Sequence, residues 1–227
     1  MYLRAAANNL ANMSTGASNY YNFSISGKAA ASGSVQAIVG SKSTKAYCFY
    51  KLFDSCSGLV AAPKLPATTL ANYGYQSMFY GCTSLTAAPA LPATNLASYC
   101  YYNMFDGCIS LTTAPALPAT NLARYCYYNM FVGCTSLTAA PALPAANLES
   151  YCYYCMFKNC TSLSIASELS VTDLTKGCYH SMFYGCTSLL SAPNLSSMTV
   201  NDYAYCNMFQ GCTSLSNAPV MRFTSIG

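Results

Sequence analysis

Fourteen cysteines, one histidine and six carboxylates are the side chains of this 227-residue sequence that could carry out chemistry. Catalysis by a cysteine nucleophile needs a nearby base, usually histidine. The one histidine, His180, stands in a column of the repeat described below that is otherwise mostly tyrosine, which favours a surface substitution over a catalytic base. No nucleophile, base and orienting group are spaced as a set. We therefore expect a chain that is not an enzyme and that holds no cofactor.

Most of the cysteines recur in two columns. The first column is complete: Cys56, Cys82, Cys108, Cys134, Cys160, Cys186, Cys212. The second column has gaps at Gly74 and Ala204: Cys48, Cys100, Cys126, Cys152, Cys178. If the columns were disulfide partners, each gap would leave the opposite cysteine unpaired, so we expect buried thiols that pack as small hydrophobic residues. The alternative is a disulfide framework typical of small secreted domains.

A metal site would need four ligands that converge on one point. The only CxxC motif joins Cys152 to Cys155, and no second pair follows at matching spacing. Cys155 also stands in a polar column that otherwise holds Lys, Ser or Asn. We expect no metal.

A 26-residue phrase repeats through the sequence without insertion. Its most recognisable part, "MFYGCTSLTAAPALPATNL" from Met78, returns as "MFDGCISLTTAPALPATNL" and then as "MFVGCTSLTAAPALPAANL". The Met-Phe pair, which is Leu-Phe in the first copy, begins at seven positions: Leu52, Met78, Met104, Met130, Met156, Met182, Met208. Strict internal repetition predicts a solenoid in which each copy packs on its neighbours.

The segment "NLASYCYYNMFDG", residues 95–107, is expected to form a helix of about ten residues. The column of Asn95 holds only Asn, Asp, Ser and Thr, which are good helix N-caps. Glycine fills the column of Gly107 in five copies, as it does where helices end. One half-turn of a helical wheel collects six apolar residues: Leu96, Ala97, Cys100, Tyr101, Met104, Phe105.

The rest of each copy predicts a brief strand, about Leu85 to Ala88, because Pro89 and Pro92 cannot donate to a strand ladder. The columns of Leu85, Ala88 and Leu91 are expected to point inward. Strands pack at about 4.8 Å and helices at about 8–10 Å, so a stack with strands on one side and helices on the other must curve. The predicted fold is an α/β solenoid. It is a leucine-rich-repeat arc of seven 26-residue repeats, with short parallel strands on the concave side and short helices on the convex side.

The shared phrase "MFxGCTSLTxAPxLPA" resembles the treponeme-type leucine-rich repeats of bacterial surface antigens, which carry a similar "AFxGCTSLTSI" core followed by proline. The Ala-Pro-rich form with "CYYNMF" is similar to a variant in surface and phage-associated proteins of gut bacteria. The resemblance extends from Tyr47 to about Pro219, and the 26-residue period is longer than is usual in that family. It implies a repeat fold and a surface for binding or adhesion, with ligands that vary.

Residues 1–46 lie outside the repeat and are expected to form a strand or hairpin that caps the solenoid of residues 47–227. The C-terminal "VMRFTSIG" has no polar cap. Either the chain is truncated there, or another domain or subunit covers the end, and self-association through this end is one possibility. The start has no apolar h-region of a secretory signal. The chain is then a piece of a longer protein, an intracellular protein, or a virion part released by lysis.

The composition argues against two classes of partner. Only 7% of the residues are charged, and the ten Lys and Arg residues are scattered rather than gathered in the basic stripe that nucleic acid requires. No stretch approaches the 18 apolar residues of a membrane-spanning helix. We expect neither nucleic-acid binding nor membrane insertion.

The remaining hypothesis is a recognition surface. The sequence predicts a non-enzymatic adhesion or receptor-binding module on a bacterial surface or a virion, whose partner is a protein or a carbohydrate. The alternative is a structural spacer or fibre segment of a larger assembly. Tyrosine is a favoured recognition residue, although repeated tyrosines can also serve packing alone. The candidate ligand-binding residues lie on two faces. The convex side is expected to carry Tyr99, Tyr102, Tyr125, Tyr128, Tyr151 and Tyr154, and the concave side Glu168, Asn194 and Asn217.

Overall fold

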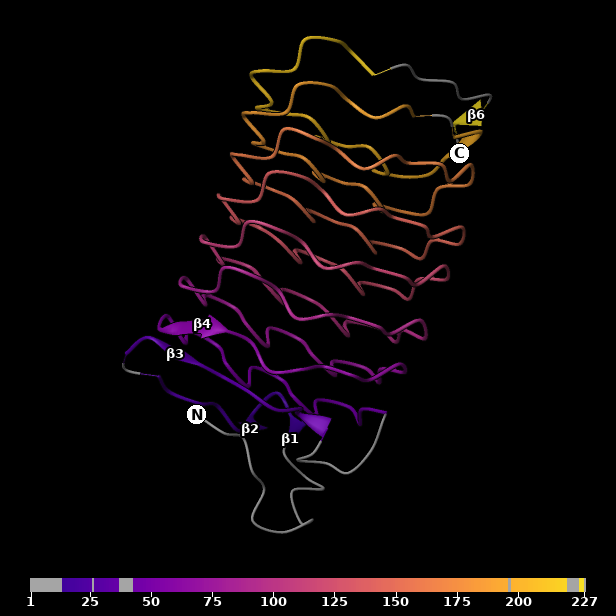
Figure 1. Ribbon diagram of the computed structural model, residues 1–227. Coiled ribbons are helices and arrows are strands. Elements are labelled where there is room, and N and C mark those ends of the chain that lie inside the picture. The colour runs from indigo at the N-terminus through magenta and orange to yellow at the C-terminus, as the bar shows by residue number, and fades with distance from the viewer. Residues whose placement is uncertain (1–13, 26, 37–42, 196, 220–224, 227) are drawn as a thin grey trace.

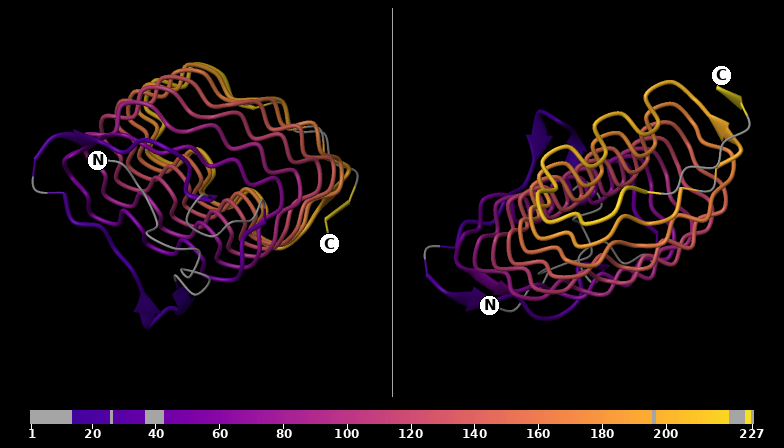
Figure 2. Two further views of the ribbon diagram at one scale, coloured as in Figure 1. Left: turned by 60° about the horizontal axis from the view of Figure 1, so that its bottom comes forward. Right: turned by 90° about the horizontal axis from the view of Figure 1, so that it is seen from above.

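The chain winds into a solenoid whose coils stack in a column (Figure 1). The computed structural model describes residues 14–219 and 225–226, apart from residues 26, 37–42 and 196. Backbone hydrogen bonds join each coil to the coil 26 residues further along the chain. Seen from above, each coil has two long sides, one folded into tight zigzags and the other more extended (Figure 2). The predicted repeat solenoid is therefore present.

Regular strands are few and short. The described strands are β1 (Ser14–Gly16), β2 (Asn19–Tyr20), β3 (Ala29–Ala30), β4 (Leu59–Ala61), β5 (Thr199–Val200) and β6 (Ser225–Ile226). Strands β1 and β2 form an antiparallel hairpin, whereas β3 pairs with β4, and β5 with β6, in parallel. The strand predicted over 85–88 is reduced to a single parallel bridge from Ala87 to Thr113, and β4 is its counterpart one coil earlier. The prolines that follow explain this brevity, since they have no N–H to donate.

The zigzag side of each coil is a chain of overlapping β-turns. We call these stretches the turn segments: residues 46–55, 72–81, 98–107, 124–133, 150–159, 176–185 and 202–211. Within one turn segment the N–H of every second residue donates to the carbonyl three residues back, as from Tyr102 to Tyr99 and from Met104 to Tyr101. Every fourth residue has a positive φ, with values of 60° at Tyr99, 53° at Asn103 and 75° at Gly107.

The other N–H groups of the turn segments all point the same way along the solenoid. The N–H of Phe105 donates to the carbonyl of Met130 at 2.9 Å, and that of Asn103 donates to the carbonyl of Tyr128 at 2.9 Å. Five such bonds cross each of the six junctions between successive turn segments, always from the earlier segment to the later one. In an ordinary parallel pair of strands, each strand both donates and accepts. This turn face therefore has a one-way hydrogen-bond pattern.

The predicted helix over 95–107 is wrong, since none of residues 43–195 lies in a helix. Helices stacked side by side would need about 8–10 Å between neighbours, whereas the extended side of the coil repeats at about 4.8 Å. The ring centroids of Phe105 and Phe131, in successive turn segments, are 5.5 Å apart. A turn segment therefore keeps nearly the spacing of the extended side. The predicted convex layer of helices is therefore not formed by residues 43–195. The predicted curvature depended on the wider spacing of helices, so the argument for it no longer holds.

The predicted helix caps are also wrong. Residues in the column of Asn95 form parallel bridges between coils instead, as in Thr69 to Asn95 and Asn121 to Asn147. Their side chains continue the pairing, and the amide of Asn147 donates to Oδ1 of Asn121 at 2.6 Å. Short polar side chains that suit a helix N-cap also suit this stacked corner, because both uses satisfy local hydrogen-bonding groups.

The predicted division into buried and exposed residues is largely confirmed. Cys100, Tyr101, Met104 and Phe105 are buried, and so are Leu85 and Leu91 on the extended side, while Ala88 is only partly buried. Phenylalanine rings stack along the whole core from Phe23 to Phe209, with centroid separations of 5.2–5.8 Å. Stacked aromatic rings add to the free energy gained from burying their surface.

The complete cysteine column lines up as a row inside the core. The thiol of Cys108 donates to the carbonyl of Phe79, and that of Cys134 to the carbonyl of Phe105, both at 3.1 Å. The same bond recurs at Cys56, Cys82, Cys160, Cys186 and Cys212. All fourteen cysteines are free thiols, and twelve of them are buried. Burial raises the pKa of both Cys108 and Cys126 to about 12, so these thiols stay protonated and can donate.

The described part of the N-terminal region covers the first coil. The ring of Phe23 stacks on that of Phe53 with centroids 5.2 Å apart, and its N–H donates to the carbonyl of Leu52 at 2.8 Å. The amide of Asn22 donates to the carbonyls of Lys51 and Asp54. The predicted capping domain, residues 1–46, includes residues 1–13, 26 and 37–42, which lie outside the described residues.

Among the residues described, no helix is both long and apolar enough to cross a membrane.

Candidate binding surface on the turn face

Two rows of tyrosines run along the turn face, and together they contain six of the nine predicted binding residues. The first row comprises Tyr47, Tyr73, Tyr99, Tyr125 and Tyr151, and the second comprises Tyr102, Tyr128, Tyr154 and His180. Each tyrosine of the first row has a positive φ, which costs about 1–2 kcal/mol for a residue with a side chain. The strained backbone places successive rings on top of one another.

The rings are packed face to face. Centroid separations are 4.4–5.1 Å in the first row and 4.4–4.8 Å in the second. The two rows also touch, with Tyr99 and Tyr102 centroids 5.8 Å apart and their rings inclined by 48°. Because neighbouring rings cover the faces, ring edges and hydroxyl groups are the parts left for a ligand. The turn face therefore favours polar partners over a sugar stacked flat on a ring.

The hydroxyl groups of Tyr102, Tyr128 and Tyr154, in the second row, are protonated at neutral pH. Partial burial raises the pKa of Tyr102 and of Tyr154 above the usual value of 10.0. Partial burial, together with the neighbouring Tyr154 and Tyr102, also raises the pKa of Tyr128. A protonated phenol can both donate and accept a hydrogen bond. The second row thus offers a line of identical donor–acceptor groups, one per coil.

His180 lies in the second row, as its column predicted, and its ring stacks on Tyr154 at 4.5 Å. Its Nδ1 is buried and has no hydrogen-bond partner among the described residues. Burial lowers the pKa of His180, which favours the neutral ring at neutral pH. A neutral stacked imidazole continues the row without adding a charge.

The first row is interrupted at Gly177, which occupies the tyrosine column between Tyr151 and Tyr203. The ring of Tyr151 lies against Gly177 so closely that a Cβ there would be 2.6 Å from the ring. Glycine also accepts the φ of +58° at this position without strain. Tyr203 is 63% exposed because no ring covers it from the preceding coil, and Lys176 lies 6.0 Å from its centroid.

The other three predicted binding residues do not join this surface. Glu168, Asn194 and Asn217 are exposed, but they belong to the extended side of the coil, and the buried leucine and phenylalanine rows separate them from the tyrosines. The nine predicted residues therefore form two separate groups. The sequence analysis expected the tyrosines and these three residues on opposite sides of the repeat, and the buried core lies between them.

One residue that sequence reasoning did not select belongs to the tyrosine surface. The guanidinium of Arg124 lies 5.1 Å from the ring centroid of Tyr125, within reach of a cation–π interaction. Its column varies freely between copies, which indicated only a water-facing position. A cation beside a row of hydroxyls was therefore hidden in a variable column.

A third tyrosine row lies in the core. Tyr75, Tyr101, Tyr127, Tyr153 and Tyr179 are buried, with successive centroids 5.6–5.9 Å apart. At its ends, Gln36 donates to the hydroxyl of Tyr75 at 3.1 Å, and Ser197 pairs with the hydroxyl of Tyr205 at 2.9 Å. Inside the row, the hydroxyls of Tyr101 and Tyr127 have no partner among the described residues. These phenols are structural and do not reach a ligand.

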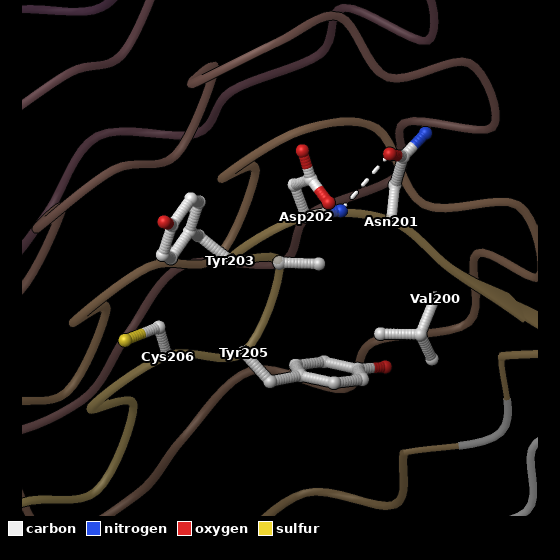
Figure 3. A pocket seen from close by; sticks show the side chains of 7 residues that line it. Val200, Asn201, Asp202, Tyr203, Tyr205 and Cys206 are labelled. Atoms are coloured by element: carbon white, nitrogen blue, oxygen red, sulfur yellow. Dashed lines mark hydrogen bonds between the residues drawn. The ribbon is translucent and has the colours of Figure 1, made fainter. Parts of the chain in front are cut away.

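A pocket of ≈ 380 Å³ lies in the last described turn region. Its lining is Val200, Asn201, Asp202, Tyr203, Ala204, Tyr205 and Cys206. Figure 3 shows the side chains of Val200, Tyr203 and Tyr205 around it, with the N–H of Asp202 bonded to Oδ1 of Asn201. Asp202 also pairs with Lys176 at 3.7 Å. Among the described residues, no group of three or more His, Cys, Asp or Glu side chains is placed to hold a metal ion.

Comparison with known proteins places this geometry beside two solved structures. No protein-family model and no curated protein matches the chain. A leucine-rich repeat protein from Bacteroides ovatus is 20% identical, with a TM-score of 0.45, and the match covers 69% of this chain and 37% of that one. A leucine rich cell surface protein from Faecalibacterium prausnitzii is 17% identical, with a TM-score of 0.37, over 86% of this chain and 60% of that one. The chain thus spans less than two thirds of the length of either relative. The solenoid described above is established from the hydrogen bonds of this chain, and these matches carry no part of that argument.

Proposed function

We propose that this chain is a non-enzymatic binding module, displayed on a bacterial surface or a virion, that recognises a protein or a glycan through the turn face. The observation that carries the proposal is the second tyrosine row, in which Tyr102, Tyr128 and Tyr154 present the same half-buried phenol at a fixed interval. A ligand with regularly spaced polar groups, such as a glycan chain or an extended peptide, matches such a row.

Rigidity supports the same proposal. Each ring is held by a stacked neighbour on the same row and a tilted neighbour on the other row. Tyrosine has few rotatable bonds, so little side-chain entropy remains to be lost when a ligand binds. The hydroxyls are therefore arranged before the ligand arrives.

The test is binding of the purified chain to glycan and protein arrays prepared from gut-bacterial surface material. We expect a ligand whose affinity falls about tenfold or more when Tyr102, Tyr128 and Tyr154 are changed to Phe, because at least two hydrogen bonds of about 1 kcal/mol each are lost while the ring stack remains. Changing Tyr101 and Tyr127 to Phe is the matched control, since these hydroxyls are buried.

Two results would refute the proposal. One is a chain that binds nothing beyond a control with scrambled repeats. The other is an equal loss of binding in the exposed and buried variants, which would show that the phenols act only through folding.

A second candidate is a structural spacer or fibre segment of a larger assembly. It is favoured by the one-way backbone hydrogen bonds that join successive coils, because such a pattern can be continued from coil to coil along a fibre. Light scattering distinguishes this function, because a fibre segment would grow into long oligomers.

A further inference from the structure

The outer surface of the extended side is apolar and regular. Residues 90–93 alternate: Ala90 and Pro92 are exposed, whereas Leu91 and Ala93 are buried. We call the exposed columns of Ala90 and Pro92 the Ala–Pro face: Lys64, Ala90, Ala116, Ala142, Glu168, and Pro66, Pro92, Pro118, Pro144. Grooves of ≈ 370 and ≈ 380 Å³ separate successive ridges of this face, lined by residues 62–66, 88–92 and 115–118.

This surface suits the burial of one flat face against another. Its prolines have no N–H, so docking would leave few donors without partners. Ala90 and Pro92 are short or rigid, and ordering them costs little side-chain entropy. The ridges recur at the spacing of the coils, so the ridges of an identical face can lie directly against them.

Charge indicates which orientation such a partner would take. Lys64 and Glu168 are the charged members of the column of Ala90, which continues to Asn194, and each lies two coils away from Ala116. Both side chains are exposed, and neither forms an ion pair among the described residues. A second copy rotated by 180° about an axis along Ala116 places Lys64 of each copy opposite Glu168 of the other. The parallel arrangement would instead place like charges together.

Side-chain size agrees with the same rotation. It sets each Ala90 against Ala142 and each Pro92 against Pro144, so that small residues meet small ones. In the neighbouring column it sets Ile165 against Ala61. Ile165 is 62% exposed, which leaves much of its apolar surface uncovered. Ala61 is exposed and leaves room for it.

We propose that the Ala–Pro face joins two copies of this chain in an antiparallel dimer with two-fold symmetry at Ala116. Five coils at about 5 Å and six extended residues at about 3.3 Å give a contact of about 25 by 20 Å, or about 500 Å² per copy. That area lies at the lower end for specific protein pairs, where weak and transient complexes are found, so we expect a dimer that dissociates on dilution. The tyrosine rows on the opposite side stay open in both copies.

Sedimentation velocity over a range of concentrations tests the proposal with the full chain. We expect a monomer–dimer equilibrium that Ala116→Glu abolishes, because it sets two carboxylates against each other on the axis. Ala116 is exposed, so the monomer stays folded, which circular dichroism checks. Lys64→Glu and Glu168→Lys should each raise the dissociation constant about tenfold, since opposed like charges disfavour pairing.

The charge-swap variants give the sharper result. An equimolar mixture of Lys64→Glu with Glu168→Lys should dimerise again, because both ion pairs re-form across the mixed dimer. Glu149→Lys makes the same change of charge at an exposed position outside the Ala–Pro face and should leave the equilibrium unchanged. A wild-type chain that stays monomeric at millimolar concentration would overturn the proposal. So would an oligomer that is insensitive to Ala116→Glu.

Discussion

The two long sides of each coil share one repeat and are held together in different ways. Across the turn face, five backbone hydrogen bonds cross each junction, all in one direction, and rows of aromatic rings stack beneath and above them. Across the extended side, successive coils meet through isolated bridges such as Ala139 to Ile165, interrupted by prolines. The comparison teaches that one side can supply most of the cohesion between coils. The other side then needs only to match the spacing, and its outer surface is free for another role.

The comparison predicts a large difference in stability between a ring in the core under the turn face and a proline outside the extended side. Phe131→Ala should lower the free energy of unfolding by about 3–5 kcal/mol, because it removes a fully buried ring and two stacking contacts. Pro118→Ala, at an exposed position, should change the same free energy by less than about 1 kcal/mol. Urea denaturation followed by circular dichroism measures both. Similar losses of unfolding free energy in the two variants would refute the conclusion that the turn face supplies most of the stabilisation between coils.

The backbone of the turn face can be tested without changing a contact. Gly133 has a φ of +67°, and a Cβ added there would have no atom within 4 Å. Gly133→Ala should therefore lower the free energy of unfolding by about 1–2 kcal/mol through backbone strain alone. Asn129→Gly, also at a positive φ, should change it by less than about 1 kcal/mol, since Asn and Gly both tolerate this conformation. The midpoints of urea denaturation measure both changes. If Gly133→Ala left the free energy of unfolding unchanged, the turn segments would have to relax without strain, contrary to the prediction.

The boundary between the two sides offers a stabilising change. Ser197 satisfies the hydroxyl of Tyr205, whereas the equivalent residue of an earlier coil is Ala119, eight residues before the unpartnered hydroxyl of Tyr127. Ala119→Ser should raise the free energy of unfolding by about 1 kcal/mol by giving that hydroxyl a partner. The gain should vanish in the Tyr127→Phe background. Thermal denaturation of the four members of this cycle gives the answer, and a gain that persists without the hydroxyl would contradict the pairing.

The smallest expected effect concerns pH at the edge of the turn face. Burial raises the pKa of Asp106 to about 6, above its unfolded value near 4, so the folded chain binds this proton more tightly. The contribution is present below pH 4 and is lost as the pH rises through 6, a change of about 1 kcal/mol after allowance for partial exposure. Asp106→Asn should flatten this part of the stability profile. Val132→Asn, in the same column one coil later, should leave its shape unchanged, and a profile that Asp106→Asn does not alter would exclude Asp106 as its source.

The sequence predicted the register of the repeat and the burial of its residues because both follow from residue type and spacing. It failed on the conformation that produces them. A turn segment has an in-in-out-out pattern of period four, as Cys100, Tyr101, Met104 and Phe105 show, and over ten residues this differs from a helical period of 3.6 by only about one residue. The direction of backbone hydrogen bonds leaves no mark on residue type.

One signal of the turns was present in the sequence. Asn103 and Gly107, four residues apart, both tolerate a positive φ. Gly107 taken by itself fits the end of a helix equally well. Tyr99, four residues before Asn103, also has a positive φ. Tyrosine rarely adopts this conformation, so the sequence did not reveal that positions 99, 103 and 107 form a series. The candidate site was predicted in the same partial way. The tyrosine rows and their separation from Glu168 follow from the columns, whereas the stacking of the rings and the position of Arg124 beside Tyr125 depend on the fold.

The one-way hydrogen bonds of the turn face can be observed directly by nuclear magnetic resonance. Scalar couplings across hydrogen bonds, measured on deuterated and isotope-labelled chain, identify which carbonyl each N–H contacts. The structure predicts a coupling from the nitrogen of Phe105 to the carbonyl carbon of Met130, and likewise from Asn103 to Tyr128. A coupling from Phe105 to the carbonyl of Tyr101, four residues back, would show a helix and contradict the account.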